Sequence, residues 1–312
     1  MPPPYARLRP AFAGGPTEVS RAFRRFRVIP NEEGQTLTIL LSRRLPNTTR
    51  ARAKELIKAG GVYVNKLRVR IPSVRVVAGE RITVYPEAST IDDLDPESLR
   101  FVHRDPSFVV LDKPAGVPVA QTKQSARGTL AAALRSKLEA EGMTRPYVGL
   151  VHRLDLQASG LVLFTIRDVA NKSLHQQFTK HGIEREYRLL VHGTCETPQS
   201  CDAALIVVQG RRVRIGTATD ARAQSALTHF RPLRPGPGAT TLLEASLETG
   251  RTHQIRAHAA HLGHPIVGDR NYGRDDDDAA RLHLHAHRLR FSHPLSGEVV
   301  DLSSELPTWA QD

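Results

Sequence analysis

Residues 248–269 read ETGRTHQIRAHAAHLGHPIVGD, a dense run of polar side chains between glycine turns. Gly250 predicts a turn, and the residues after it predict a helix over about 252–262. His253 and Arg256 are three residues apart and therefore share one face of that helix. So many polar groups cost too much free energy to bury for packing alone. The segment therefore indicates a functional site.

A second motif, VHRLD at residues 151–155, lies directly ahead of an apolar run at 160–165 that predicts a buried strand. An aspartate between an arginine and such a strand is expected to be ionised and held in position. Asp155 is therefore a candidate for chemistry. Taken alone, the motif is weak evidence, and a purely structural pair between Arg153 and Asp155 is the default interpretation.

A third motif, REY at residues 185–187, leads into another predicted strand. Period-two alternation puts Arg185 and Tyr187 on the same side of that strand. A tyrosine beside a carboxylate could stack on a base or carry a proton. Taken alone, Tyr187 could equally be a core tyrosine whose hydroxyl lies at the rim of the core.

These motifs are embedded in a region where strands follow one another with few intervening helices. We therefore expect an α+β domain on a largely antiparallel mixed sheet with flanking helices, not a βαβ array. Strands are predicted at 108–112, 160–165, 187–191, 204–208, 226–230 and 241–247, and helices at 129–141 and at 168–179, the latter capped by Asp168.

The positive charge of the chain is concentrated at its start. Residues 1–86 carry 17 Lys and Arg against 5 Asp and Glu, whereas residues 87–312 carry 27 of each. Arg outnumbers Lys by 36 to 8, and guanidinium groups bind phosphate with two hydrogen bonds. The pattern favours a nucleic acid partner. A GC-rich genome would explain the Arg-to-Lys ratio too, but not the asymmetry along the chain.

Composition divides the chain into four expected segments. These are a basic disordered arm over 1–30, a small α/β module over 31–86, an acidic linker over 87–100 and a larger domain over 101–312. Within the module we predict helices at 36–45 and 50–59 and strands at 62–65, 74–77 and 81–85.

The second of these helices carries a basic stripe. Arg50, Lys54 and Lys58 are spaced by four residues and share one face, which suits a folded RNA backbone. An ordinary solvated face is the alternative. The module resembles the S4 RNA-binding domain through GVYVN at 61–65 and AGE at 78–80, although TLT at 36–38 replaces the usual Arg-Leu-Asp.

The larger domain resembles the RluA-like family of RNA pseudouridine synthases over roughly residues 101–305. The resemblance rests on several ordered motifs, any one of which would be weak alone. They are HRLD at 152–155 with SGL at 159–161, Arg185-x-Tyr187, GRTHQIRxH at 250–258, GHPIxGD at 263–269, Tyr272-Gly273, LHAxRL at 284–289 and HPLSGE at 293–298.

The resemblance implies isomerisation of uridine to its C-glycoside without metal or cofactor. By analogy, Asp155 is the nucleophile or base, Arg256 pairs with it, and Tyr187 stacks on the target base. Arg153 would enter the RNA stack from which the uridine is extruded. The remaining residues expected to bind RNA are Arg185, Arg251, His253, Arg50, Lys54, Lys58 and Asn65. The residues do not distinguish a covalent adduct from a glycal intermediate.

Two departures from the family pattern bear on substrate choice more than on catalysis. Leu156-Gln157-Ala158 stands where the family usually has polar or basic residues and a Thr or Ser. Arg185 stands for the family's lysine, which keeps the charge but not a titratable amine.

The sequence offers two alternative classes of function. A metal-dependent hydrolase is suggested by histidines at 283, 285, 287 and at 258, 261, 264, but no acid–His spacing of a catalytic metal site accompanies them. A catalytically inactive RNA-binding or ribosome-assembly protein of the same fold is disfavoured because Asp155, Tyr187 and Arg256 occur together.

Partners and compartment follow from the same reading. We expect RNA as the partner, with large-subunit ribosomal RNA favoured and transfer RNA as the alternative, and a monomer. No apolar run of 18 residues predicts a membrane span. Cys195 and Cys201 lie in a polar stretch without a disulfide framework, so a reducing, cytoplasmic location is expected.

Overall fold

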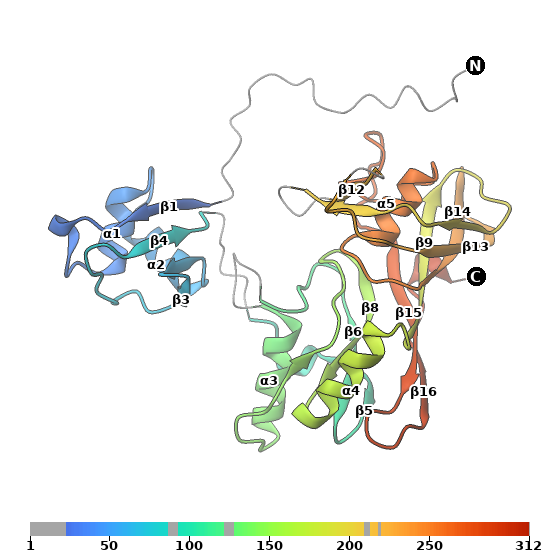
Figure 1. Ribbon diagram of the computed structural model, residues 1–312, viewed down its shortest axis with the longest axis horizontal. Helices are drawn as coiled ribbons and strands as arrows, with labels where there is room; N and C mark the ends of the chain where they lie inside the picture. Colours follow the sequence, from blue (N-terminus) through green and yellow to red (C-terminus); the bar gives the residue numbers. More distant parts are fainter. Residues whose placement is uncertain (1–22, 87–92, 122–127, 209–212, 218–219, 312) are drawn as a thin grey trace. The chain divides into compact units, whose positions relative to one another are not determined.

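A computed structural model describes residues 23–86, 93–121, 128–208, 213–217 and 220–311 (Figure 1). The chain divides into two compact units, Met1–Ala88 and Ser89–Asp312. Both belong to the expected fold class, a small S4-like module and a larger α+β domain.

The first unit packs two helices against an antiparallel sheet with the strand order β1-β4-β2-β3. The helices begin where threonine side chains accept backbone N–H groups: Thr36 caps Ile39, and Thr49 caps Arg52. Apolar residues of both helices, β2 and β4 form its core. The elements are β1 (Arg24–Arg27), α1 (Leu37–Arg44), α2 (Arg50–Lys58), β2 (Val62–Val64), β3 (Leu67–Val69) and β4 (Arg81–Val84).

Two expectations for this unit were wrong. The end of the basic arm is strand β1, whose Phe26 pairs with Ile82 of β4; residues 1–22 lie outside the described ranges. The segment 74–77 is not a strand of the sheet. Instead, the carbonyl of Val74 accepts the N–H of Leu37, which is one of the donors that the first turn of α1 leaves free.

The second unit is built on a large mixed sheet with the strand order β10-β13-β14-β9-β15-β8-β6-β5; β16 adds to β15 and β7 to β8. Among the described strands, only β8 and β15 pair in parallel. The strands are β5 (Arg100–Arg104), β6 (Phe108–Lys113), β7 (Gly149–Leu150), β8 (Ser159–Thr165), β9 (Glu184–His192), β10 (Gln199–Cys201), β13 (Thr228–Pro235), β14 (Thr240–Leu247), β15 (Leu284–Ser292) and β16 (Val299–Ser303).

Helices cover both faces of this sheet. Alternate residues of β6 point to opposite faces, so Val109 packs with α3 (Leu130–Ala140) and Phe108 with α4 (Asp168–Thr179). The third helix, α5 (Gln254–His261), packs on β9 and β14 through its apolar residues. The predicted helices are therefore confirmed, but Asp168 is the first residue of α4 and not its cap.

The parallel contact between β8 and β15 depends on a glycine. Gly160 has φ +105°, and a Cβ added there would overlap the backbone carbonyl of Ala286 on β15. Only glycine permits both this backbone conformation and this close approach. The contact brings the start of β15 beside the loop that precedes β8, where the candidate nucleophile lies.

Two further segments differ from expectation. The described part of the acidic linker packs on the second unit: Asp95 caps the short helix η2 (Pro96–Ser98), and Glu97 binds Lys137 of α3 at 2.7 Å. Residues 87–92 lie outside the described ranges. The strand predicted at 204–208 forms a separate hairpin of β11 (Leu205–Val207) and β12 (Val213–Ile215), outside the main sheet.

Candidate active site

Asp155 lies in the loop between β7 and β8, and this loop is tied to the turn after β6. The carbonyl of Leu156 accepts the N–H of Gly116 at 2.8 Å and the Nζ of Lys113 at 3.1 Å. Lys113 is fully buried and also donates to the carbonyls of Pro114 and Val117. The turn therefore fixes the residue next to Asp155.

Lys113 was not among the sequence candidates. Its burial lowers the pKa of its amine to about 8, while the negative charges of Asp155 and Asp112 oppose the shift. The available signal was a lysine at the end of the apolar strand FVVLDK at 108–113, where a charged side chain needs several acceptors to be tolerated.

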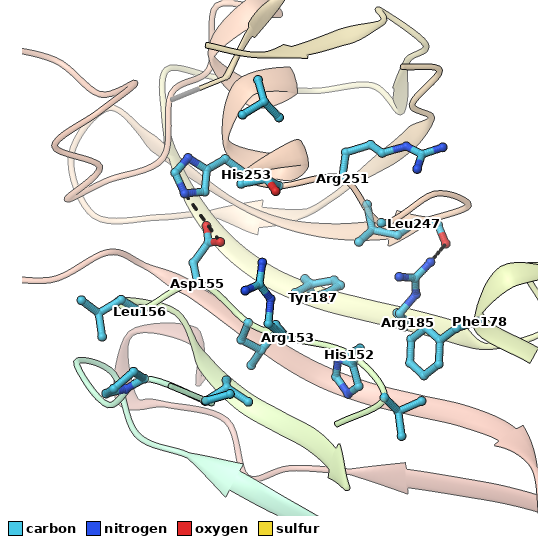
Figure 2. A pocket seen from close by; sticks show the side chains of 18 of the residues that line it. His152, Arg153, Asp155, Leu156, Phe178, Arg185, Tyr187, Leu247, Arg251 and His253 are labelled. Atoms are coloured by element: carbon cyan, nitrogen blue, oxygen red, sulfur yellow. Dashed lines mark hydrogen bonds and ion pairs between the residues drawn. The ribbon is translucent and has the colours of Figure 1, made fainter. Parts of the chain in front are cut away.

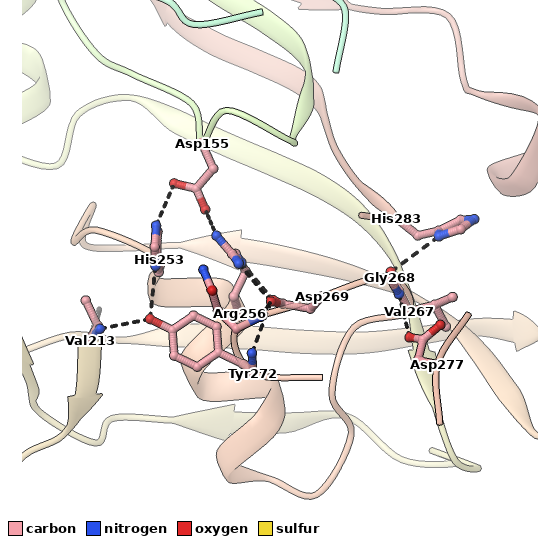
Figure 3. A network of polar contacts seen from close by, with 11 residues as sticks. Asp155, Val213, His253, Arg256, Val267, Gly268, Asp269, Tyr272, Asp277 and His283 are labelled. Atoms are coloured by element: carbon pink, nitrogen blue, oxygen red, sulfur yellow. Dashed lines mark hydrogen bonds and ion pairs between the residues drawn. The ribbon is translucent and has the colours of Figure 1, made fainter. Parts of the chain in front are cut away.

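Arg256, on α5, joins the candidate nucleophile to a second aspartate (Figure 3). Its Nη1 donates to Asp155 Oδ2 at 2.9 Å, and its Nε and Nη2 donate to the two oxygens of Asp269 at 2.7 Å each. Burial lowers the pKa of Arg256, but the hydrogen bonds and charges of Asp269 and then Asp155 outweigh it and raise the pKa overall. The sequence motif predicted the pair with Asp155 but assigned no role to Asp269.

His253 lies near the other oxygen of the Asp155 carboxylate. His253 Nε2 is 3.8 Å from Asp155 Oδ1, and its Nδ1 is 2.9 Å from the hydroxyl of Tyr272. Desolvation lowers the pKa of His253, although the charge of Asp155 opposes this, so the imidazole is neutral at neutral pH. Asp155 is therefore bracketed by a guanidinium and an imidazole.

These residues open into a cleft of about 900 Å³ (Figure 2). Asp155 and His253 lie at one side of the cleft, Arg185 and Phe178 at the other, and Tyr187 between them. The side chain of Asp155 is 22% exposed, so its carboxylate reaches the cleft. A pocket of this size lined by rings and a few charged groups suits a nucleotide with its neighbours.

Tyr187 and Arg185 do share one side of β9, as the alternation requires, and both line the cleft. Desolvation raises the pKa of Tyr187, so its phenol is protonated at neutral pH. The neighbouring Glu186 faces away and binds Arg288 at 2.9 Å, so it is not a partner for the tyrosine.

Arg185 is buried but weakly held. Its guanidinium carbon lies 5.5 Å from the centre of the Phe178 ring, and its Nη2 is 3.4 Å from the carbonyls of Leu247 and Thr249. Its Nε has no hydrogen-bond partner among the described residues. A guanidinium that lines the cleft and makes only weak contacts through its Nη2 is suited to an incoming phosphate.

His152 anchors the loop between β7 and β8 that carries Asp155. It stacks on Phe178 with ring centres 5.0 Å apart, and its Nε2 accepts the N–H of Leu163 at 3.0 Å. Burial, with a smaller contribution from the charge of Arg185, lowers the pKa of His152 to about 3. His152 is therefore a neutral anchor for the exposed Arg153 that follows it.

The other predicted RNA-binding residues are placed differently. Arg251 is exposed at the cleft, and its Nε donates to the carbonyl of Ser225. In the S4-like unit, Arg50, Lys54 and Lys58 are all exposed on α2. The Asn65 side chain, in the turn between β2 and β3, is engaged by the start of β4: it donates to Glu80 and accepts the N–H of Arg81.

Within the described ranges, no three His, Cys, Asp or Glu side chains come together in a way that could hold a metal ion. The two cysteines are buried free thiols. None of the helices described has both the length and the apolar character that a membrane crossing requires.

Comparison with known proteins agrees with this geometry. A family model described as RNA pseudouridylate synthase matches residues 107–261, and the S4 domain model matches residues 35–82. Ribosomal large subunit pseudouridine synthase D of Zymomonas mobilis is 34% identical over 88% of this chain and 91% of that protein. An uncharacterized RNA pseudouridine synthase of Aquifex aeolicus is 32% identical over the same shares.

A solved structure is similar as well. Human RNA pseudouridylate synthase domain containing 1 superimposes with a TM-score of 0.58 and 25% identity, over 70% of this chain and 87% of that one. The chain therefore belongs to the RNA pseudouridylate synthase family: it is an isomerase that converts uridine in RNA to pseudouridine, and it carries an S4 domain ahead of its synthase domain.

Proposed function

We propose that this synthase modifies a uridine of large-subunit ribosomal RNA and that Asp155 is the nucleophile or base that begins the reaction. The observation that supports the role of Asp155 is its carboxylate, held at 2.9 Å by Arg256 while it faces the cleft. A fixed carboxylate is preorganised for the positive charge that develops on the sugar as the base departs.

The reaction needs no external reagent. The bond between N1 of uracil and C1′ breaks, the base turns, and a bond between C5 and C1′ forms. The hydrogen on C5 leaves as a proton, and N1 gains a proton. Atoms and electrons therefore balance within the nucleotide and solvent.

Access to the reacting carbon requires the nucleotide to leave its stack, which costs a few kcal/mol. We assign Arg153 to the gap that the flipped base leaves, because it is exposed two residues before Asp155. Tyr187 offers its ring to the uracil inside the cleft. Arg185 and Arg251 lie at the cleft with cationic groups for the flanking phosphates.

The preference for large-subunit ribosomal RNA is supported by the name of the Zymomonas relative and by the S4-like unit. Arg50, Lys54 and Lys58 would contact the RNA backbone away from the reacting uridine. We further propose that the protein acts as a monomer in the cytoplasm. Light scattering would show a mass near 34.5 kDa.

The catalytic assignment is tested by tritium release from RNA that contains 5-tritiated uridine. Wild type should release tritium, Asp155→Ala should not, and the exposed control Asp275→Ala should behave as wild type. Equal release by wild type and Asp155→Ala would reject Asp155. Release by none of them from total RNA of a deletion strain would favour the binding-only alternative.

The substrate is tested by mapping pseudouridines in that strain through carbodiimide-dependent primer-extension stops. We expect stops to disappear from large-subunit ribosomal RNA and to return with wild type but not with Asp155→Ala. Loss of a stop in transfer RNA, with none lost in ribosomal RNA, would reject the proposed substrate.

A further inference from the structure

The backbone of His253, directly before α5, has an unusual conformation. It precedes α5 with φ 53° and ψ 23°, in the left-handed region that few residues other than glycine adopt. Such strain persists only where neighbouring structure enforces it, and it concentrates at functional sites. The surrounding structure therefore holds His253 in this conformation directly ahead of α5.

The hydrogen bonds around His253 favour one tautomer. The hydroxyl of Tyr272 accepts the N–H of Val213 at 2.9 Å, so its own hydrogen is free to go to Nδ1 of His253. Nδ1 is then the acceptor of the neutral ring, and Nε2 carries the hydrogen. That N–H faces Asp155.

These two groups are close to each other but are not hydrogen-bonded, so a third group beside them can bind both. Nε2 of His253 and Oδ1 of Asp155 are 3.8 Å apart, which is too long for a hydrogen bond. The other oxygen of Asp155 is bound by Arg256. In the part of the chain that the structure describes, Oδ1 of Asp155 has no hydrogen-bond donor and the Nε2 hydrogen of His253 has no acceptor, and the two groups lie side by side at the cleft (Figure 3).

The stereochemistry of ribose shows what fits beside this oxygen. The base stands on one face of the sugar ring and the 2′-hydroxyl on the other, on the carbon next to C1′. A carboxylate that approaches C1′ opposite the departing base therefore meets the 2′-hydroxyl. Reacting atoms about 3.0–3.5 Å apart would bring this hydroxyl within reach of a donor beside the carboxylate.

We propose that His253 donates its Nε2 hydrogen to the 2′-oxygen of the target uridine, so that the site selects ribose over deoxyribose. The inference rests on the proposed function, because it requires Asp155 to act at C1′. A 2′-hydroxyl contact is the means by which a protein distinguishes RNA from DNA at one nucleotide. His253 is thus a specificity residue in addition to a neighbour of the nucleophile.

The test uses two RNA oligonucleotides around the mapped uridine, identical except for ribose or 2′-deoxyribose on that nucleotide, both tritiated at C5. The key variant is His253→Asn. Asparagine tolerates the left-handed backbone, and its amide can reach the Tyr272 hydroxyl but is too short to bridge toward Asp155. His253→Gln is the conservative rescue, because its longer amide returns a donor near Nε2.

For His253→Asn we expect kcat/KM on the ribose substrate to fall roughly tenfold or more and that on the deoxyribose substrate to stay within about twofold. The preference for ribose would shrink by the same factor, and His253→Gln would recover part of it. Comparing each variant on both substrates cancels the intrinsic difference in reactivity of the two sugars.

Equal losses of kcat/KM on both substrates would overturn the inference and leave His253 a purely structural role. If His253→Asn does not fold, Tyr272→Phe replaces it. Loss of the Tyr272 hydroxyl allows Nδ1 of His253 to carry the hydrogen, which should also reduce the preference for ribose. A wild type without activity on the ribose substrate, or an Asp155→Ala variant as active as wild type, would instead reject the proposed function.

Discussion

Arg256 binds Asp269 through two hydrogen bonds of 2.7 Å and Asp155 through one of 2.9 Å. The Asp269 side chain is fully buried, and one of its oxygens also accepts the N–H groups of Asn271 and Tyr272. Asp269 therefore sets the orientation of the guanidinium. Nη1 is left to bind the carboxylate that faces the cleft.

Asp269→Asn should weaken both folding and catalysis. Asparagine keeps the size of the side chain but leaves the buried guanidinium without one of its charge partners. We expect the free energy of unfolding, measured in urea, to fall by about 3 kcal/mol. We also expect kcat to fall at least about tenfold, because the donor to Asp155 is no longer fixed. The matched control is Asp276→Asn, which breaks an exposed pair with Arg274 and should leave the free energy of unfolding and kcat close to those of wild type.

His152 makes stability depend on pH. Its pKa is lowered from 6.5 to about 3 in the folded protein, so the unfolded chain binds more protons between these values. The contribution of neutral His152 is therefore complete above pH 6.5 and is lost as pH falls towards 3. By about pH 4.5, wild type should lose roughly 2–3 kcal/mol more than His152→Gln, whose oxygen can accept the Leu163 N–H without titrating. Parallel urea titrations of both proteins measure this, and identical pH dependence would contradict it.

Gly250→Ala should act through Arg185. A Cβ at Gly250 would lie 2.7 Å from Nη1 of Arg185, and the flexible guanidinium would have to move away. Because Gly250 does not need a left-handed backbone, we expect an unchanged melting temperature and a KM for RNA raised about threefold to tenfold. Arg185→Lys should raise KM by a similar factor. The Gly250→Ala/Arg185→Lys double variant should have a KM close to that of either single variant. Fully additive effects on KM would show that the two positions act separately.

Much of the fold could be predicted from the sequence, because its helices and strands depend on residues that are close together in the chain. The helices α2 and α4 lie within one residue of their expected bounds, since apolar periodicity and a run of turn residues mark both ends. The pair of Asp155 and Arg256, 101 residues apart, came instead from ordered family motifs, because no local pattern connects such distant groups.

The missed features depend on distant partners. β1 lies in an arginine-rich stretch, and its pairing partner β4 is more than fifty residues away. Lys113 and Asp269 gain their importance only through the acceptors and donors that the fold brings around them. Sequence periodicity carries no information on such contacts, so neither residue was singled out.

The basic face of α2 should contribute binding energy for RNA that is sensitive to salt and independent of the chemical step. Each phosphate contact releases counterions, so removing contacts flattens the dependence of affinity on salt. For Arg50→Ala/Lys54→Ala/Lys58→Ala, we expect the slope of log K against log salt to decrease by about 2–3. The rate at saturating RNA should be unchanged, because these residues belong to the other unit and not to the cleft. The matched control, Arg50→Lys/Lys54→Arg/Lys58→Arg, keeps all three charges and should keep the wild-type slope. If the alanine variant binds ribosomal RNA with the wild-type salt dependence, the stripe is an ordinary solvated face, and the S4-like unit must hold RNA through other residues.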